Sequence, residues 1–323
     1  MPPNDILDLA RQVKSNTEQK HISLLSGGFS SQAYKIDTGN NEPFVLLVER
    51  PGGVSQSNYA HGFIVLKLLQ NHGYKYSPSP LWLKNDHKAI AISFFDGVSS
   101  EQFKFNEKIS PEHLAIEVMD SLLETSFVTL EEYQQLASKY NVEQPPIETP
   151  IEVARQYGTE WFELVKKSCP DKDIVDWLEP RVIQSVELAK SLGDNKPIFG
   201  HGDPSNPNIL ISQDGTFKLI DWDSSRFHTT IPEFFIYYTT HLTDFMKPYR
   251  EVLIRHVSER LSIPVEVLNK KVTELRHFSE VFDVNWAGMM MAKVNSGETT
   301  GNINEFRKIA KERIKKYEES FED

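Results

Sequence analysis

Cysteine is almost absent from this chain of 323 residues, which contains only Cys169. A single cysteine excludes an internal disulfide and a zinc site built from several thiolates. No apolar run reaches the length that a membrane-spanning helix needs, and the first twenty residues lack the apolar core of a signal peptide. We therefore expect a soluble, cytoplasmic protein without a membrane partner.

Basic residues are also in short supply, since 35 Lys and Arg side chains stand against 46 Asp and Glu and give a formal net charge of −11. This balance argues against a broad basic surface that would bind nucleic acid. Residues 1–97 carry 9 basic and 8 acidic groups, whereas residues 98–323 carry 26 and 38. The acidic second part is interpreted either as a solvated surface or as one that attracts a cationic small molecule, and charge alone leaves both open.

The first 97 residues consist of short apolar runs that turn-forming residues separate. They predict a helix over residues 1–20, strands over 21–25, 33–36, 44–48, 81–83 and 89–94, and a helix between Val54 and His72. Asp96-Gly97 ends the pattern. We expect a small β-rich nucleotide-binding lobe over residues 1–97 and a larger lobe over residues 98–323.

The second part is mainly helical by the same criterion, because apolar residues recur three or four positions apart. The stripes are Leu114, Val118 and Leu122, then Val272, Leu275, Phe278 and Phe282, then Phe306, Ala310, Ile314 and Tyr317. Such stripes predict helix faces that pack in a core, and the methionines of Trp286–Met291 fit the same interpretation. The predicted fold class is α+β, with two lobes.

A polar loop between two short apolar strands is the exception. His201, Asp203 and Asn208 form the pattern H-x-D-x-x-x-x-N, and Asp221 ends the next strand. Phosphoryl transfer needs a carboxylate that orients an acceptor hydroxyl and accepts its proton, as Asp203 would do, and Mg²⁺ needs hard oxygen ligands, as Asn208 and Asp221 would supply. His201 is interpreted as a structural residue that hydrogen-bonds the loop. The alternative is an Asp-Pro and Asn-Pro turn that only joins two strands.

At these residues the sequence resembles the aminoglycoside phosphotransferase and choline kinase-like superfamily. His201-Gly202-Asp203 with Asn208 is similar to its catalytic loop, and Ile220-Asp221-Trp222-Asp223 to its metal-binding strand end. Protein kinases prefer H-R-D and D-F-G here, so the spelling favours the small-molecule branch. The resemblance implies a two-lobed protein-kinase-like fold, with Asp203 as catalytic base and Asn208 and Asp221 as Mg²⁺ ligands. It also implies a small-molecule kinase that transfers the terminal phosphate of ATP or GTP to a hydroxyl acceptor.

Two segments are candidates for nucleotide contacts. The glycine-rich turn between the first two strands comprises Ser26, Gly27, Gly28, Phe29 and Ser30, followed by Ser31. Its backbone N–H groups would lie over the phosphates, although such a turn is also common in plain hairpins. The hinge residues Ser93, Phe94 and Phe95 would offer backbone groups to the purine, and the alternative is an apolar strand that ends at a turn.

The resemblance fails at the cation that kinase-like enzymes place on the third strand. The simplest alignment of the third strand puts Leu47 at that position, and a shift of the alignment by two or three residues puts Glu49 or Arg50 there. No Asp or Glu occurs between Arg50 and Asn85, so the following helix cannot supply an acidic partner. Arg50 and then Lys35 are the candidates for a phosphate contact, and Lys35 fits a solvent-exposed charge better.

The acceptor and two rival functions stay open at this stage. Residues near the catalytic loop that are contacts or bystanders are Asp223, Tyr237, Tyr238, His241, Asp283 and Trp286; acids and aromatics of this kind suit an amine. Glu233 is a candidate anchor for the following helix. The missing helix Glu motivates the first rival, a nucleotide-binding pseudokinase that acts as a scaffold or regulator. A protein kinase is the second rival, and the motif spelling counts against it.

Overall fold

The computed structural model describes residues 3–25, 31–39, 42–49, 58–142, 147–191, 196–229, 235–236, 239–240 and 243–321. The chain divides into two compact units. Unit 1 comprises Met1–Pro146, Ile198–Phe227 and Tyr238–Leu253, and unit 2 comprises Ile147–Pro197, His228–Tyr237 and Ile254–Asp323. Unit 1 therefore contains both the N-terminal strands and the polar loop that the sequence singles out.

Unit 1 begins with helix α1 (Pro3–Val13) and an antiparallel sheet of five strands in the order β1-β2-β3-β5-β4. The strands are β1 (Ile22–Leu24), β2 (Ser31–Ile36), β3 (Phe44–Glu49), β4 (Pro80–Leu83) and β5 (Ala89–Ser93). All five predicted strands are confirmed within two residues at either end. The predicted N-terminal helix is shorter than expected.

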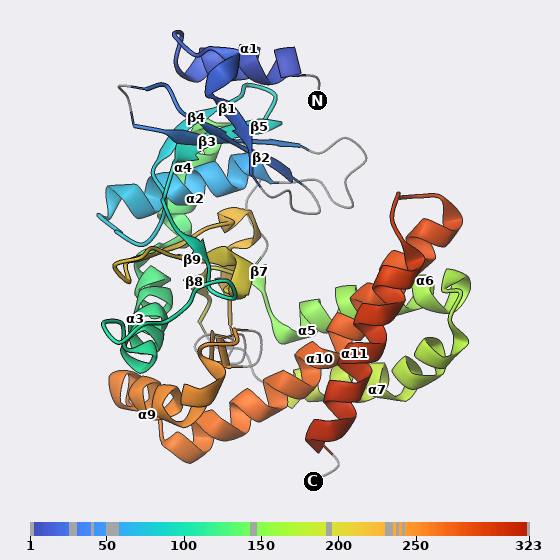
Figure 1. Cartoon of the computed structure of the whole chain (residues 1–323). Helices are drawn as coiled ribbons and strands as arrows, with labels where there is room; N and C mark the ends of the chain where they lie inside the picture. Colours follow the sequence, from blue (N-terminus) through green and yellow to red (C-terminus); the bar gives the residue numbers. More distant parts are fainter. Residues whose placement is uncertain are drawn as a thin grey trace. The chain divides into compact units, whose positions relative to one another are not determined.

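The two faces of this sheet have different neighbours. Phe44, Leu46 and Val48 alternate along β3 and are buried against α1, which covers this face (Figure 1). Because successive strand residues point to opposite faces, Leu47 and Glu49 belong to the other face. Both are only partly buried.

Helix α2 (Tyr59–Asn71) packs in the interior of unit 1. Its first turn is capped by Asn58, whose Oδ1 accepts the N–H of His61 at 3.3 Å. The helix is buried on nearly every side because it contacts β4, β5, helix α4 (Leu130–Lys139) and the 3₁₀ turn Trp222–Ser224. This confirms a helix in the predicted place from residue 59 onward.

Short strands join the end of the N-terminal sheet to the polar loop. Strand β6 (Val98–Ser99) pairs with β9 (Ile209–Ile211), which also pairs with β10 (Phe217–Leu219). Strand β8 (Ile198–Gly200) precedes the loop and lies beside β11 (Arg226–His228). Helix α3 (Pro111–Glu124) completes the regular elements that belong wholly to unit 1, and α9 (Arg250–Leu261) begins in it.

Unit 2 is built almost entirely of helices. Its elements are β7 (Ile147–Glu148), α5 (Pro150–Val153), a π-helical stretch Ala154–Glu160, α6 (Trp161–Ser168), α7 (Lys172–Ser191), α10 (Val265–Ser296) and α11 (Ile303–Phe321). Helix α10 packs against α6, α7 and α11. Its predicted stripe from Val272 to Phe282 is buried, as are Met289, Met290 and Met291, so the core interpretation of these residues is confirmed.

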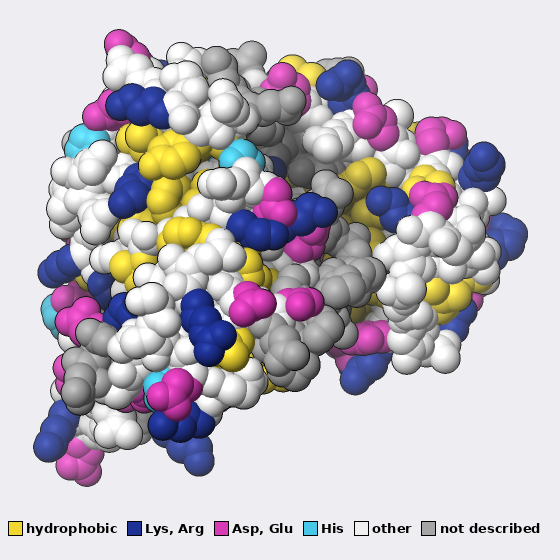
Figure 2. All heavy atoms as spheres, turned by 90° about the horizontal axis from the view of Figure 1, so that it is seen from above, with side chains coloured by type: hydrophobic (Ala, Val, Ile, Leu, Met, Phe, Trp, Pro, Cys, Tyr) yellow, Lys and Arg dark blue, Asp and Glu magenta, His cyan; other side chains and the backbone are white. Residues whose placement is uncertain are grey.

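The fold class agrees with the α+β prediction, with a small antiparallel sheet and a larger helical part. In the part of the chain that the structure describes, no helix combines the length and apolar character needed to span a membrane. Acidic and basic side chains are mixed over the face shown in Figure 2, and neither sign forms a continuous patch there.

Candidate active site

The loop between β8 and β9 brings Asp203 and Asn208 into direct contact. The side-chain Nδ2 of Asn208 donates to Oδ2 of Asp203 at 2.9 Å and to the Asp203 backbone oxygen at 3.0 Å. Asn208 is buried at the end of the 3₁₀ turn Asn206–Asn208. With Nδ2 turned toward Asp203, Oδ1 of the same amide is the oxygen left to bind a cation.

His201 fixes the loop against the end of strand β10. Its Nε2 donates to the backbone oxygen of Ile220 at 2.8 Å, and its Nδ1 accepts from the backbone N–H of Asp203 at 3.4 Å. Burial lowers the pKa of His201 to about 4, so the ring is neutral and can accept at Nδ1 while it donates at Nε2. The predicted structural role of His201 in the loop is confirmed.

Gly202 allows the loop to approach the segment that follows Asp221. Its φ is +80°, a value that side-chain-bearing residues rarely adopt. A Cβ at this position would lie 1.9 Å from the backbone oxygen of Ser224. The close approach of the two segments therefore depends on glycine at position 202.

Asp221 occupies a strained turn after strand β10. Its φ of +65° and ψ of +54° are left-handed, and non-glycine residues held in this region cluster at functional sites. The turn is fixed on both sides: the Ile220 N–H donates to the Asn208 oxygen at 2.9 Å, and Trp222 Nε1 donates to the Leu219 oxygen at 2.7 Å. These bonds bring Asp221 back beside the loop, as the hairpin arrangement predicts.

Neighbouring carboxylates disfavour the ionisation of Asp203 and of Asp221. Desolvation raises the pKa of Asp203, and the charge of Asp223 raises it further, against hydrogen bonds from Ser205 and Asn208 that lower it. The Asp221 side chain opens to solvent, yet the protein atoms packed around it remove much of its hydration and raise its pKa well above the ordinary value, with Asp223 and Asp203 adding to the effect. A site of concentrated negative charge favours a cation.

The donor set fits Mg²⁺ that is shared with phosphates. In the described residues no three His, Cys, Asp or Glu side chains form a metal-binding group. Mg²⁺ in nucleotide enzymes is usually held by one or two protein oxygens, water and substrate phosphates rather than by an all-protein cage. The Oδ1 of Asn208 and the carboxylate of Asp221 suit that arrangement.

His61 of helix α2 contacts the segment that follows Asp221, a contact the sequence reasoning missed. Its Nε2 donates to the backbone oxygen of Ser225 at 2.6 Å, and its Nδ1 accepts from the Tyr133 hydroxyl at 2.6 Å. Burial lowers the pKa of His61 to about 4, so the ring is neutral. A lone polar residue among apolar helix positions was the available signal, but its partner Ser225 lies 164 positions away.

The predicted nucleotide contacts are only partly covered by the structure. The glycine-rich turn Ser26, Gly27, Gly28, Phe29 and Ser30, and Arg50, lie outside the described residues. At the hinge, the Ser93 N–H donates to the Ser79 oxygen at 2.8 Å and the Phe94 N–H to the Pro43 oxygen at 3.3 Å. Of the three hinge residues, Phe95 is the one whose N–H has no such partner in the described chain.

The face of the sheet opposite α1 carries Leu47, which the simplest alignment of the third strand puts where kinase-like enzymes have a Lys or Arg. Lys35 lies on the neighbouring strand β2, and its Nζ stands 4.1 Å from the ring centre of Phe94. This cation–π contact places the Lys35 charge beside the hinge. Arg50 and Lys35 therefore both stay candidates.

The acceptor candidates are divided between the described and undescribed parts of the chain. Tyr237, Tyr238 and His241 lie outside the described residues, as does Glu233, the candidate anchor of the following helix. Asp223 belongs to the carboxylate group of unit 1, whereas Asp283 and Trp286 belong to helix α10 of unit 2. Asp223 is thus the one acceptor candidate that the described structure places beside Asp203.

Comparison with solved structures gives the fold a precedent. A spectinomycin phosphotransferase in complex with ADP and spectinomycin matches with a TM-score of 0.65 at 18% identity, over 96% of this chain and 93% of that one. Choline kinase LicA from Streptococcus pneumoniae matches with 0.63 at 16% identity, over 97% and 98%. Ethanolamine kinase from Plasmodium vivax matches with 0.62 at 15% identity, over 95% and 84%. These likenesses confirm the protein-kinase-like fold.

Sequence comparison identifies the family. A comparison with curated proteins found no match. The profile of the phosphotransferase enzyme family, by contrast, matches residues 21–261, about three quarters of the chain. The matched region includes His201, Asp203, Asn208 and Asp221. The chain therefore belongs to the phosphotransferase enzyme family.

Proposed function

We propose that this protein is a Mg²⁺-dependent small-molecule kinase that transfers the terminal phosphate of ATP to a hydroxyl of its acceptor. The observation that carries the proposal is the direct contact between Asp203 and Asn208, with Asp221 brought beside them. We propose ATP rather than GTP as the donor, because the structure of a similar phosphotransferase was solved with ADP and nothing in the comparisons favours a guanine nucleotide.

In this mechanism Asp203 orients the acceptor hydroxyl and accepts its proton. The Asn208 amide and Ser205 hydrogen-bond its carboxylate and hold its orientation. Desolvation raises the pKa of Asp203, which makes it a stronger base than an ordinary aspartate.

Asn208 and Asp221 would hold Mg²⁺ against the donor phosphates. When bound, the ion neutralises charge on the phosphates and on the group that leaves. Asp221 occupies the left-handed turn after β10, where its carboxylate and that of Asp203 are close enough to interact electrostatically. His201 and His61 stay neutral and hold the two segments in register through their backbone contacts.

A small molecule with a cationic group is the acceptor class that we propose. Support comes from the excess of acidic residues over residues 98–323 and from the neighbours, which are named for choline, ethanolamine and spectinomycin. The scaffold alternative rests on the absence of an acidic residue between Arg50 and Asn85. Neither the family match nor the solved structures favour it.

Substitution of Asp203 tests the proposal. With an acceptor found by screening amino alcohols, aminoglycosides and sugars, Asp203→Asn should lower kcat by about 10²–10⁴-fold and leave the Kd for Mg-ATP within about threefold of wild type. Asp8→Asn removes one exposed carboxylate from α1 and should leave both unchanged. Undiminished kcat in Asp203→Asn would refute the base assignment.

A further inference from the structure

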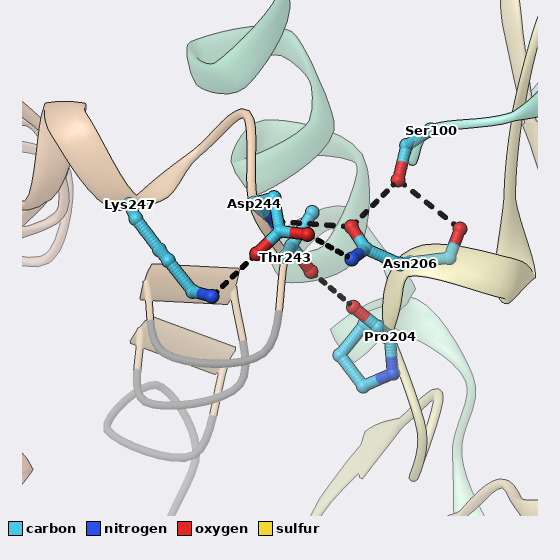
Figure 3. A network of polar contacts seen from close by, with 6 residues as sticks. All are labelled: Ser100, Pro204, Asn206, Thr243, Asp244 and Lys247. Atoms are coloured by element: carbon cyan, nitrogen blue, oxygen red, sulfur yellow. Dashed lines mark hydrogen bonds and ion pairs between the residues drawn. The ribbon is translucent and has the colours of Figure 1, made fainter. Parts of the chain in front are cut away.

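The stretch between Asp203 and Asn208 is held by a polar network whose centre is Asn206 (Figure 3). Asn206 is only 8% exposed. Its Nδ2 donates to Oδ2 of Asp244 at 3.1 Å, and its Oδ1 accepts the backbone N–H of Asp244 at 3.0 Å. The two residues thus face each other through a reciprocal pair of hydrogen bonds, although 38 positions separate them.

Two further contacts fix the same stretch. Thr243, which is fully buried, donates its hydroxyl to the backbone oxygen of Pro204 at 3.2 Å. Ser100, directly after strand β6, donates its hydroxyl to the backbone oxygen of Asn206 at 3.1 Å and to its Oδ1 at 3.0 Å. Lys247 completes the network with an ion pair to Oδ1 of Asp244 at 2.5 Å.

The hydrogen bonds of this network hold the part of the loop that lies between Asp203 and Asn208. Pro204 directly follows Asp203, and Asn206 precedes Asn208 by two residues, so the network holds the backbone between the two side chains that touch. A shift of the Asn206 backbone would separate the Asn208 amide from the Asp203 carboxylate, which now lie 2.9 Å apart. Misplacement by about 1 Å in an active site is enough to cost about 10²-fold in rate.

We infer that Asn206 and Asp244 are positioning residues of the transfer reaction, which clamp the catalytic loop so that Asp203 and Asn208 meet. The inference rests on the proposed function for its effect on turnover. The pairing itself is a property of the fold. Neither residue touches the reacting atoms in this role, and both act through the loop backbone.

The chemistry of the pair gives a reciprocal test. Asn206→Asp turns a donor into a second carboxylate opposite Asp244, and two acceptors at about 3.1 Å repel each other. Asp244→Asn keeps an amide oxygen that accepts from Asn206, and it loses the exposed ion pair with Lys247. The double variant N206D/D244N again places one donor opposite one acceptor, with the two roles exchanged. The backbone N–H of residue 244 and the Ser100 hydroxyl still find a side-chain oxygen at position 206.

Turnover and hydrogen exchange of the loop peptide around residues 200–210 are measured for wild type, both single variants and the double variant. Asn206→Asp should lower kcat at least tenfold, raise the Mg²⁺ concentration for half-maximal rate and speed exchange in the loop. Asp244→Asn should stay within about threefold of wild type, and N206D/D244N should return to the level of Asp244→Asn. Asn304→Asp, an exposed substitution of the same kind beside Arg307, is the control and should change nothing.

The outcomes separate this inference from the proposed function. If hydrogen exchange in the loop of Asn206→Asp equals that of wild type, the clamp by Asn206 and Asp244 is overturned. It is also overturned if the kcat of N206D/D244N is as low as that of Asn206→Asp, because the defect then comes from the added charge near Asp203. Faster exchange with unchanged kcat overturns the positioning role and leaves the proposed function standing. A wild-type protein that phosphorylates no acceptor refutes the proposed function, and the exchange data with their rescue still support or overturn the clamp.

Discussion

Replacement of Gly202 by alanine tests the close approach of the two loop segments. The added Cβ would lie 1.9 Å from the Ser224 oxygen, whereas real Cβ atoms stay at 3.0 Å or beyond, so the segments must separate by about 1 Å. The left-handed backbone adds about 1–2 kcal/mol and the overlap about 1–3 kcal/mol. We expect Gly202→Ala to lower the free energy of unfolding by about 2–5 kcal/mol.

The same displacement should impair catalysis, because it moves Asp203 relative to Asp221. A misplacement of about 1 Å predicts a loss of about 10²-fold in kcat under conditions where the variant remains folded. Urea denaturation followed by circular dichroism gives the stability, and a coupled assay of ADP release gives the rate.

Gly73→Ala is the matched control for the backbone conformation. Gly73 has a φ of +72° and no atom within 4 Å of an added Cβ, so this variant carries the cost of the left-handed backbone without an overlap. It should lose about 1–2 kcal/mol and keep full activity. The account of Gly202 would be wrong if Gly202→Ala matched Gly73→Ala in both stability and rate.

Two further predictions concern His61. Burial lowers the pKa of His61 to about 4 in the folded state, against about 6.5 in the unfolded chain, so acidification protonates the unfolded state first. Between pH 7 and pH 5 the free energy of unfolding should therefore fall by about 2 kcal/mol more in wild type than in His61→Asn. An equal fall in both proteins would contradict this prediction. Tyr133→Phe leaves the buried Nδ1 of His61 without its hydrogen-bond donor. In urea denaturation this variant should lower the free energy of unfolding by about 1–3 kcal/mol. A loss below about 0.5 kcal/mol would show that the hydrogen bond contributes little.

Local pattern was sufficient to predict the elements of the N-terminal sheet and to single out the loop in which Asp203 and Asn208 meet. The stretch Phe44–Val48 of strand β3 is a continuous apolar run between turn-forming residues, and such a run is visible in the residues themselves. The types and spacing of Asp203 and Asn208 were read from the requirements of phosphoryl transfer, and their catalytic roles stay a prediction.

Contacts between distant segments were beyond this reasoning. His61 reaches Ser225 and Asn206 reaches Asp244 across 164 and 38 positions, and no local pattern marks either pair. The need for glycine at position 202 arises from the Ser224 oxygen, which only the folded chain brings close. Side chains that act through a tertiary neighbour therefore cannot be identified from a single sequence.

The central claim is that Asn208 and Asp221 form a Mg²⁺-dependent nucleotide site, and thermal denaturation with ATP tests it without knowledge of the acceptor. At a hundred times its Kd, Mg-ATP should stabilise the wild-type protein by about 2.7 kcal/mol, with no comparable effect of ATP in EDTA. Asp221→Ala should fold and should lose this stabilisation. Equal stabilisation of Asp221→Ala and wild type, or none in the wild type, would contradict the account.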